Sequence, residues 1–438
     1  MAAAPEIAAA PRASRYGGRF AAAAALYNLL LHLLFLALWL PALAWREFRG
    51  RFLNRLGFRL PRLRRSVWLH SPSVGEALAI RTFVRHLRGA FPGYDIVLTT
   101  FTSGGRQVAK QVAADHHLAL PYDLMPSVAL TVRALKPALF LVVEGDYWPN
   151  LVYALQRRGV PVAAVNGRVS AKAAAGYRRA AWLFRPLFNR LALVCAADKE
   201  YIPAYMALGV PPERIVVTGN LKYDNYQSEP ATDVIALIQA ALGNPRREDV
   251  LVAASTHPGE EDLVADVFLA LRVRRPALKL FVAPRYPERA GAVVALMAAR
   301  GLTAARRREL PRPSTVDVVV LDTLGELSGL YALGAVAVIG GSFVPRGGQN
   351  MVEAAFQGCV TVWGPHVENF PAETARLAGR GGVAVAGANE LQAALEELYA
   401  FDEVRARLGE AAAATAAEMM GASARTIAVL RRLMGEDK

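Results

Sequence analysis

The segment "HSPSVGE", residues 70–76, places a carboxylate in a helix-capping pattern directly after an apolar run. Ser73 and Glu76 have the S-x-x-E spacing of a capping box, in which the serine caps the helix and the glutamate reaches back to the serine amide. Capping boxes are common, so the spacing alone favours a structural role for Glu76. A carboxylate presented to a cleft at a helix start could also accept a substrate proton, which makes Glu76 a candidate general base.

Two further charged residues, Glu144 and Lys222, are candidates for a reaction site. Glu144 in "EGDYWPN" follows four apolar residues, where a carboxylate needs a partner or shows a raised pKa. Lys222 in "GNLKYD" is a candidate anion ligand if its strand ends beside a cleft, although a lone lysine is usually solvated. The polar residues after Glu144 are typical of a turn and a cap before a helix opened by Pro149: Asp146, Trp148 and Asn150.

The segment "GGSFVPRGGQNMVEAAFQG" is the strongest phosphate-binding candidate. Its glycines lie between a predicted strand and a helix predicted to begin near Asn350, where backbone amides could bind an anion: Gly340, Gly341, Gly347 and Gly348. Glu353, in the first helical turn, could accept ribose hydroxyl groups. The alternative is a flexible loop whose acid is favoured by the helix dipole. No G-x-G-x-x-G follows the first strand, so a dinucleotide-binding fold is not supported.

Two weaker patterns accompany this segment. Arg285 in "PRYPER" could clamp a phosphate or carboxylate, although such an arginine alone is more often a surface charge. Gly325 in "DTLGEL" marks a place where the backbone could approach a base edge, and the alternative is a helix start after Asp322 or Thr323. The histidines at 70, 257 and 366 have no metal-ligand spacing, so the sequence predicts no metal site.

The elements that must position these residues alternate between strands and helices. Predicted strands cover residues 66–71, 94–100, 117–122, 138–145, 160–167, 191–198 and 214–220, then 250–256, 279–285, 316–323, 336–342, 359–365 and 382–387. The runs are apolar almost throughout, which is typical of parallel strands buried on both faces. With helices between them, they predict two doubly wound α/β domains.

The unusual polar clusters nearly all follow a strand directly. The carboxyl ends of parallel strands share one sheet edge, where ligands bind, so loops of both halves could face each other across one cleft. The polar stretch 224–233 suggests a break between an N-terminal domain, 46–226, and a C-terminal domain, 227–438. The terminal helices, about 403–434, could pack back across the first domain.

Composition narrows the function classes. The 438 residues carry 51 Lys+Arg against 37 Asp+Glu, a net charge of +14, which suits nucleic acid, an anionic membrane surface or phosphorylated substrates. A GC-rich genome would also enrich arginine. The two cysteines, Cys195 and Cys359, lie in apolar runs and are predicted to be buried thiols, which leaves no disulfide framework.

Residues 20–45 contain 26 consecutive uncharged residues, long enough to cross a bilayer. Eight arginines follow at once and favour a cytoplasmic location for everything downstream: Arg46, Arg49, Arg51, Arg55, Arg59, Arg62, Arg64 and Arg65. The same arginines could bind anionic headgroups, which also favours a membrane anchor at residues 20–45. The residues before the anchor, 1–19, are predicted to be disordered. Asn28, His32 and Pro41 leave an in-plane helix as an alternative, and the segment is too long for a cleaved signal.

Nine segments in order, spanning about residues 25–430, together resemble the bacterial 3-deoxy-D-manno-octulosonic acid (Kdo) transferases: "WLHSPSVGE", "TTFTSGG", "EGDYWPN", "GNLKYD", "STHPGEE", "PRYPER", "DTLGEL", "GGSFVPRGGQN" with Glu353, and "GPHVENF". The resemblance implies a membrane-associated glycosyltransferase of the GT-B fold, with two Rossmann-like domains facing a cleft. It implies transfer of Kdo from CMP-Kdo to the lipid A precursor, with inversion and without a metal ion.

The resemblance also implies roles for single residues. Glu76 corresponds to the base, and Glu144 and Lys222 to the stabilisers of the transition state. The implied CMP contacts are Pro284 and Arg285, then Leu324, Gly325 and Glu326, and finally Asn350, Met351, Val352 and Glu353.

This chain departs from the usual family pattern at several of these motifs. "EGDYWPN" stands where the family more often has E-T-E-L-W-P-N, so the second acid is the shorter Asp146 and Tyr147 replaces a leucine. Tyr286 and Gln349 stand where the family often has histidine, and "NGRVS" stands for N-A-R-L-S. These changes concern the acceptor more than the donor nucleotide.

The expected partners are CMP-Kdo, the lipid A precursor and anionic inner-membrane lipids, with no nucleic acid, no obligate protein partner and no cofactor beyond the donor. The expected location is the inner membrane, with a single N-terminal anchor and the catalytic domains on the cytoplasmic face. One alternative is another GT-B sugar-nucleotide transferase or epimerase, which binding of UDP rather than CMP would reveal. The other is a non-catalytic membrane-surface protein, which would not need Glu76.

Overall fold

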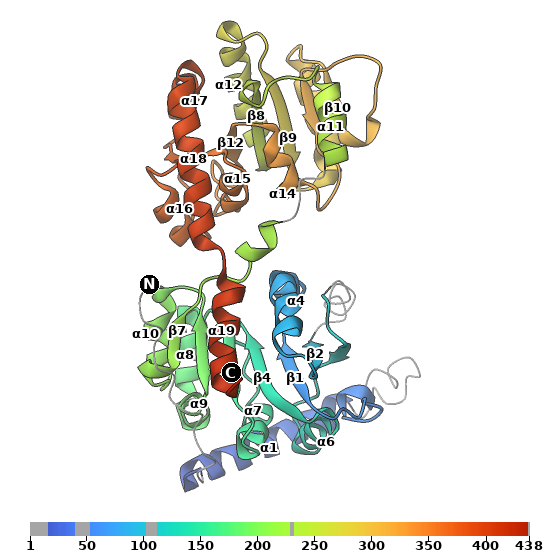
Figure 1. The fold of residues 1–438 in the computed structure, drawn as a ribbon, viewed down its shortest axis with the longest axis vertical. Helices are drawn as coiled ribbons and strands as arrows, with labels where there is room; N and C mark the ends of the chain where they lie inside the picture. The colour runs from blue at the N-terminus through green and yellow to red at the C-terminus, as the bar shows by residue number, and fades with distance from the viewer. Residues whose placement is uncertain (1–15, 40–52, 102–111, 228–231, 437–438) are drawn as a thin grey trace. The chain divides into compact units, whose positions relative to one another are not determined.

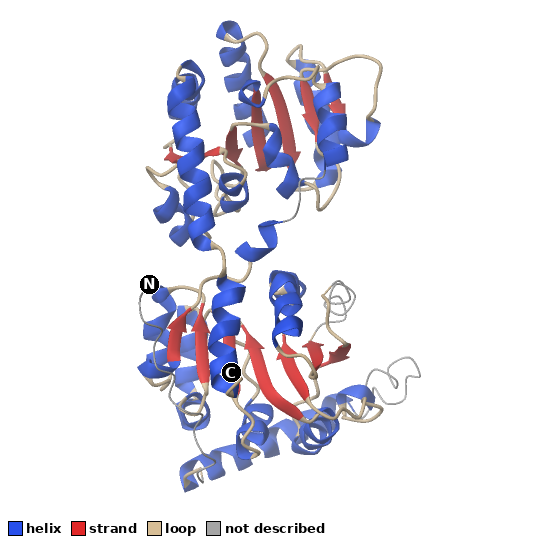
Figure 2. Cartoon of the chain, in the orientation of Figure 1, coloured by secondary structure: helices blue, strands red, loops and turns tan. Residues whose placement is uncertain are grey.

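The computed structural model describes residues 16–39, 53–101, 112–227 and 232–436, which form two compact units (Figure 1). The first unit comprises Met1–Asn225 and Met420–Lys438, and the second comprises Tyr226–Met419. The chain therefore leaves the first unit once and returns to it for its last helix. Each unit is built on one parallel sheet with helices packed on it (Figure 2).

The sheet of the first unit has seven parallel strands in the order β3-β2-β1-β4-β5-β6-β7. The strands are β1 (Ser66–His70), β2 (Asp95–Thr100), β3 (His116–Ala119), β4 (Pro137–Val143), β5 (Val162–Gly167), β6 (Leu193–Ala196) and β7 (Ile215–Val217). The order reverses direction between the neighbours β1 and β4. Such a switch point is where doubly wound sheets bind ligands, beyond the carboxyl ends of the strands.

The helices of the first unit are α1 (Gly18–Trp39), α3 (Val74–Ala79), α4 (Arg81–Ala90), α6 (Met125–Leu135), α7 (Pro149–Arg157), α8 (Ala171–Arg179), α9 (Ala181–Phe188), α10 (Ile202–Ala207) and α19 (Ala422–Met434). Short 3-10 turns are η2 (Lys199–Tyr201) and η3 (Pro212–Arg214), with η4 (Tyr223–Gln227) at the passage to the second unit. Helix α19 packs beside α4 in the first unit, whereas α18 (Asp402–Met419) belongs to the second.

Both faces of the first sheet are buried, which explains its continuous apolar runs. Side chains of a strand alternate between the two faces. Val67 and Leu69 of β1 therefore join a core that includes residues of α4 and α19, whereas Trp68 joins a second core with residues of α6, α7 and α9.

The sheet of the second unit is also parallel, in the order β10-β11-β9-β8-β12-β13-β14, with its switch point between β8 and β12. The strands are β8 (Val250–Thr256), β9 (Lys279–Pro284), β10 (Ala304–Arg306), β11 (Val318–Val320), β12 (Val336–Ile339), β13 (Val360–Trp363) and β14 (Gly382–Ala384). The helices are α11 (Thr232–Ala241), α12 (Glu260–Arg274), α13 (Ala290–Ala299), α14 (Leu327–Leu330), α15 (Val352–Phe356), α16 (Pro371–Leu377), α17 (Ala388–Ala400) and α18. The 3-10 turns are η5 (Arg247–Asp249), η6 (Pro287–Arg289), η7 (Arg307–Glu309) and η8 (Tyr331–Leu333).

The predicted fold class is confirmed, because two parallel sheets with intervening helices account for the described residues. Each predicted strand is present, and the sequence missed only β10 among the strands in the described ranges. The predicted buried thiols, Cys195 and Cys359, are both buried and free.

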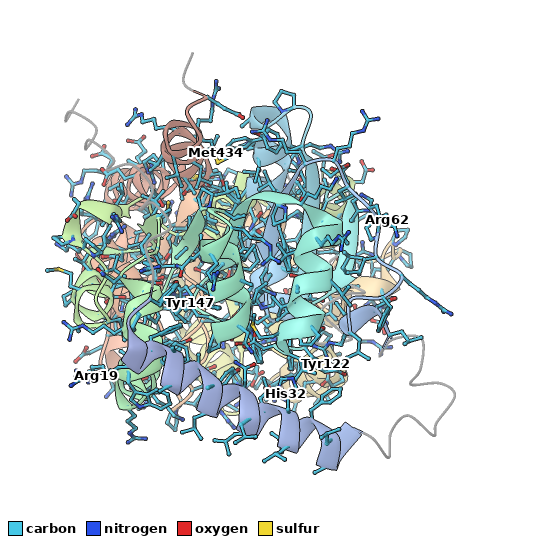
Figure 3. The ribbon with its side chains drawn as sticks, turned by 90° about the horizontal axis from the view of Figure 1, so that it is seen from below. Arg19, His32, Arg62, Tyr122, Tyr147 and Met434 are labelled. Carbon is cyan, nitrogen blue, oxygen red and sulfur yellow. The ribbon has the colours of Figure 1, made fainter. Side chains whose placement is uncertain are left out.

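The apolar N-terminal segment forms α1, which is long and apolar enough to cross a membrane by length and composition alone. Residues 40–45 of the predicted anchor and residues 1–15 of the segment expected to be disordered lie outside the described residues. Gly18 and Arg19 belong to the helix, so the expectation of disorder is wrong for them. Seen from below in Figure 3, α1 lies lengthwise across the first unit.

Candidate functional site

Glu76 lies in the first turn of α3, directly after β1, and completes the predicted capping box. The Ser73 hydroxyl accepts a hydrogen bond from the Glu76 amide at 3.3 Å, and Glu76 Oε2 accepts one from the Ser73 amide at 2.8 Å. A carboxylate has a second oxygen with lone pairs of its own. The cap therefore fixes the direction of the Glu76 side chain while occupying Oε2.

Glu144 lies one residue beyond β4, the strand beside β1, with a left-handed backbone at φ +63°. That conformation costs a non-glycine residue about 1–3 kcal/mol and persists only where the surroundings hold it. The Glu144 carbonyl accepts hydrogen bonds from the Arg168 amide at 3.2 Å and the Tyr205 hydroxyl at 3.1 Å. These hydrogen bonds therefore hold the strained Glu144 backbone in place directly after β4.

The pKa of Glu144 depends on the charges of the other two catalytic candidates, Glu76 and Lys222. Burial raises the pKa of the Glu144 carboxyl, Arg168 lowers that pKa, Glu76 raises it and Lys222 lowers it. Glu76 and Lys222 are thus both within electrostatic reach of Glu144, and all three lie in the first unit. A carboxylate with a raised pKa beside a second carboxylate is an arrangement typical of active sites.

Asn166, at the end of β5, joins the Glu144 loop to the segment that carries Lys222. Its Nδ2 donates to Glu144 Oε1 at 3.3 Å, and its Oδ1 accepts from the Leu221 amide at 3.0 Å. The side chain is buried and the backbone is left-handed, at φ +53°, a conformation that asparagine tolerates better than most residues. Sequence analysis quoted "NGRVS" without a role for Asn166, and that tolerance was the available signal.

Asn225 makes the corresponding connection to the Glu76 helix. Its Nδ2 donates to the carbonyl oxygens of Leu78 and Ala79 at the end of α3, at 3.1 and 2.8 Å. Its Oδ1 accepts from the Thr82 amide at the start of α4, at 3.1 Å. The two asparagines therefore fix the loops that follow β4 and β7 and the helix that follows β1, whereas the Lys222 side chain itself is exposed.

The interpretation of Asp146 and Asn150 as turn and cap residues was wrong. Asp146 Oδ2 contacts His70 Nε2 at 3.2 Å and accepts from Trp148 Nε1 at 3.0 Å, so it joins β1 to the loop after β4. The α7 amides of Asn150 and Leu151 are capped instead by Asp123, at 2.9 and 2.8 Å. Helix α7 begins at Pro149, as predicted.

The predicted nucleotide contacts lie in the second unit at strand ends. Pro284 is the buried last residue of β9, and Arg285 follows it with an exposed side chain. The Arg285 amide donates to the Thr256 carbonyl at 2.9 Å, and its guanidinium lies 5.5 Å from the centre of the Tyr286 ring. The amide hydrogen bond fixes the backbone at the strand end, and the Arg285 side chain remains exposed.

The segment 324–326 offers mainly its backbone. Leu324 and Gly325 are exposed, with Gly325 at φ +85°. Both carboxylate oxygens of Glu326 accept hydrogen bonds from the Arg307 guanidinium at 2.9 Å. The Glu326 carboxylate is therefore bound to a residue of its own unit. The alternative of a helix start after residue 322 or 323 is wrong, because α14 begins at Leu327.

The glycine-rich loop is held by hydrogen bonds from its backbone amides to a buried carboxylate, that of Glu260. Glu260, buried at the start of α12, accepts from the amides of Gly341 at 2.7 Å and Phe343 at 2.9 Å. The Gly348 amide donates to the Gly341 carbonyl at 2.8 Å. The amides of Gly341 and Gly348, which the sequence offered to a phosphate, therefore have partners within the unit.

The segment 350–353 divides into two kinds of residue. Met351 and Val352 are fully buried in the core, so only their backbone could meet a nucleotide. Asn350 Oδ1 accepts from the Val352 amide at 3.1 Å, and its Nδ2 donates to Glu353 Oε1 at 2.9 Å. Helix α15 begins at Val352, two residues after the predicted start, with Glu353 in its first turn.

One cationic residue near this loop, Arg346, was missed by sequence analysis. Burial lowers the pKa of His257, and the charges of Arg346 and Arg285 lower it further, while Glu260 opposes them. Arg346 is exposed and lies within the quoted glycine-rich segment, so its charge was the available signal. Arg285 and Arg346 therefore both place positive charge near His257, which follows β8.

Other predicted features are structural or outside the described residues. Arg55 is half-buried, with its guanidinium 4.6 Å from the Phe101 ring and 4.8 Å from the Tyr122 ring. Arginines 46, 49 and 51 and most of "TTFTSGG" lie outside the described residues. In the described part of the chain, no three His, Cys, Asp or Glu side chains gather where they could hold a metal ion.

The fold and these strand-end loops define the GT-B architecture. The chain is similar to the UDP-GlcNAc 2-epimerase of Neisseria meningitidis, with a TM-score of 0.58, 12% identity, and coverage of 84% of this chain and 100% of that one. At that identity the likeness shows the fold alone.

Sequence comparison adds the family. Residues 49–225 match the family described as 3-Deoxy-D-manno-octulosonic-acid transferase (kdotransferase). The chain is 33% identical to the 3-deoxy-D-manno-octulosonic acid transferase of Haemophilus influenzae, covering 83% of this chain and 86% of that one. It is also 33% identical to that of Bordetella pertussis, covering 89% and 93%. The chain belongs to the Kdo transferase family, so it is a glycosyltransferase, and the non-catalytic alternative falls.

Proposed function

We propose that this enzyme transfers Kdo from CMP-Kdo to the lipid A precursor. The observation that carries the proposal is the electrostatic interaction of Glu144, which follows β4 at the switch point of the first sheet, with Glu76 and Lys222, in a chain of this family. The names of its relatives support Kdo as the transferred sugar. The Neisseria meningitidis epimerase of the same fold was solved with UDP-GlcNAc bound, so the donor nucleotide is the point to test.

In the proposed reaction, an acceptor hydroxyl attacks the anomeric carbon of Kdo. A bond forms between the hydroxyl oxygen and that carbon, while the bond from the carbon to the CMP phosphate oxygen breaks and its electron pair leaves with CMP. Glu76 accepts the hydroxyl proton, a role worth roughly 10²–10⁴ in rate. A single displacement of this kind inverts the anomeric centre.

Lys222 and Glu144 take supporting roles. The ammonium of Lys222 stabilises negative charge that develops on the leaving phosphate. Glu144, which accepts a hydrogen bond from Asn166, interacts electrostatically with both Lys222 and Glu76.

Donor binding is assigned to the second unit. Arg285 and Arg346 bind the phosphate and carboxylate of the donor, and the exposed backbone at Leu324 and Gly325 meets the base. Asn350 and Glu353 receive the ribose hydroxyl groups. CMP carries one phosphate, so charge neutralisation needs a metal ion less than a sugar diphosphate does.

Calorimetry on the purified full chain in chelator tests the donor assignment. CMP should bind, and UDP should bind at least tenfold more weakly. A preference for UDP, or loss of CMP binding in chelator, would assign the chain to another GT-B chemistry or to a metal-dependent one.

We also propose residence at the inner membrane with both units on the cytoplasmic face, where the donor nucleotide is made available. The exposed arginines 59, 62, 64 and 65 would face anionic headgroups. Recovery of the full-length chain only in the soluble fraction of disrupted cells would contradict this location.

A further inference from the structure

The N-terminal end of α1 is held on the first unit by an aromatic cluster. The Tyr16 and Phe20 rings stack with centroids 4.4 Å apart, and the Arg190 guanidinium lies 3.7 Å from the Tyr16 centroid. The Tyr16 hydroxyl donates to Gln156 Oε1 of α7 at 2.5 Å. Phe20 is buried in the same core as residues of α7 and α9. This end of the helix is therefore part of the folded unit.

The middle of α1 is held by polar side chains. The Tyr27 hydroxyl donates to the buried Asp123 at 2.9 Å. Asn28 and Asn150 pair through reciprocal amide hydrogen bonds, at 3.0 and 2.8 Å. A polar side chain is costly in hydrocarbon, and here each one has a partner on the protein.

Farther along, Phe35 packs on Tyr122 with ring centroids 5.6 Å apart. Tyr16, just before the helix, and the contact positions 20, 24, 27, 28 and 35 recur at helical spacing, so they form one stripe that faces the first unit. The stripe runs for some 20 residues, which is about 30 Å at 1.5 Å per residue. Nearly the whole described helix lies along the unit (Figure 3).

The outward side of α1 is apolar. Six leucines are each 50–59% exposed: Leu26, Leu29, Leu30, Leu33, Leu34 and Leu36. Arg19 precedes them in an exposed position, and Arg62 is visible from the same side in Figure 3. A basic recess of the same unit is lined by Arg59, Arg62, Arg133 and Lys136. A leucine row accompanied by cations matches a bilayer surface with anionic headgroups.

We infer that α1 lies in the plane of the membrane surface, with its leucines in the boundary between headgroups and acyl chains and its polar stripe on the first unit. A spanning α1 would carry the surface that it packs on into the hydrocarbon, including the guanidinium of Arg190. The in-plane helix keeps both of its ends on one side of the membrane. The inference rests on the proposed membrane location and does not depend on the sugar transferred.

The side of the membrane on which residue 17 lies distinguishes an in-plane α1 from a membrane-spanning α1. Gly17 has open space where a Cβ would lie, and both native cysteines are buried, so Gly17→Cys in the full chain provides one reactive thiol. Val273→Cys, at a residue 82% exposed on α12, is the cytoplasmic reference. A membrane-impermeant maleimide should label both variants in inverted vesicles and neither in intact spheroplasts. Labelling of Gly17→Cys from outside, with Val273→Cys protected, would establish a spanning helix and overturn the inference.

The occupant of the leucine face is tested separately with purified full-length protein. Leu29→Ser with Leu33→Ser should lower binding to phosphatidylethanolamine–phosphatidylglycerol vesicles roughly tenfold or more, because exposed apolar area drives insertion. Val273→Ser, which removes a similar exposed side chain elsewhere, should leave binding unchanged. If the leucine variant instead loses a dimer by light scattering and keeps vesicle binding, the face belongs to a second copy and the inference fails. Failure in either assay with normal Kdo transfer would leave the proposed reaction standing.

Discussion

Replacing Glu76 with glutamine separates its two roles. Glutamine keeps an acceptor oxygen for the Ser73 amide, so the capping box at 2.8 Å survives and stability should change by only a few tenths of a kcal/mol. The amide cannot accept the hydroxyl proton. Turnover should therefore fall by roughly 10²-fold or more, which corresponds to about 2.7 kcal/mol of transition-state stabilisation.

A second readout comes from Glu144. The charge of Glu76 raises the pKa of Glu144, so the neutral glutamine should lower the Glu144 pKa. The acidic limb of the residual rate against pH should shift down accordingly, while CMP affinity stays near that of the wild type.

Ser73→Ala is the matched control for the cap. It removes the hydroxyl that accepts from the Glu76 amide at 3.3 Å, which should cost about 1 kcal/mol of stability. Its loss of rate should be much smaller than that of Glu76→Gln. Steady-state kinetics and thermal denaturation check both variants together. Near-normal turnover in Glu76→Gln would refute the assignment of the base and leave the residue as a cap.

Three other variants probe the surrounding structure. Arg285→Ala should raise the Kd of CMP roughly tenfold with or without chelator, as measured by calorimetry, since it removes one charge-assisted contact. Asn166→Ala leaves Glu144 and the Leu221 amide without their shared partner, so it should cost about 1–3 kcal/mol of stability and lower turnover while CMP affinity is retained. Burial raises the pKa of Asp123 from 3.8 to about 7, so its contribution to stability should be greatest at low pH and decline as pH rises toward 7. Denaturant midpoints between pH 5 and 8 should show this decline in the wild type but not in Asp123→Asn.

The strands and their direction were predictable because burial on both faces leaves continuous apolar runs. Strand β10 was missed because its residues, "AAR", belong to a basic stretch and form a short edge of the sheet. The capping box of Ser73 and Glu76 was predictable because its spacing is local. These features depend on neighbours in sequence or on average burial.

The site depends on contacts between distant residues, which one sequence does not encode locally. Asn166 and Leu221 are 55 residues apart, and Gly341 and Glu260 are 81 apart. The latter contact removes one amide, that of Gly341, which the glycine pattern had offered to a phosphate. Asn28, interpreted as a weakness in a membrane span, proves to be a contact with Asn150, 122 residues away. The assigned catalytic and donor residues remain predictions until variants are measured.

The most direct test of the central claim is the mass of the product. Purified full-length protein, incubated with CMP-Kdo and a lipid A precursor in chelator, should yield an acceptor heavier by a whole number of Kdo residues, with one CMP released per residue added. Glu76→Gln, folded and able to bind CMP, should yield little of this product in the same time. An unchanged acceptor mass with the wild-type enzyme, or equal product from a UDP-sugar donor, would contradict the account.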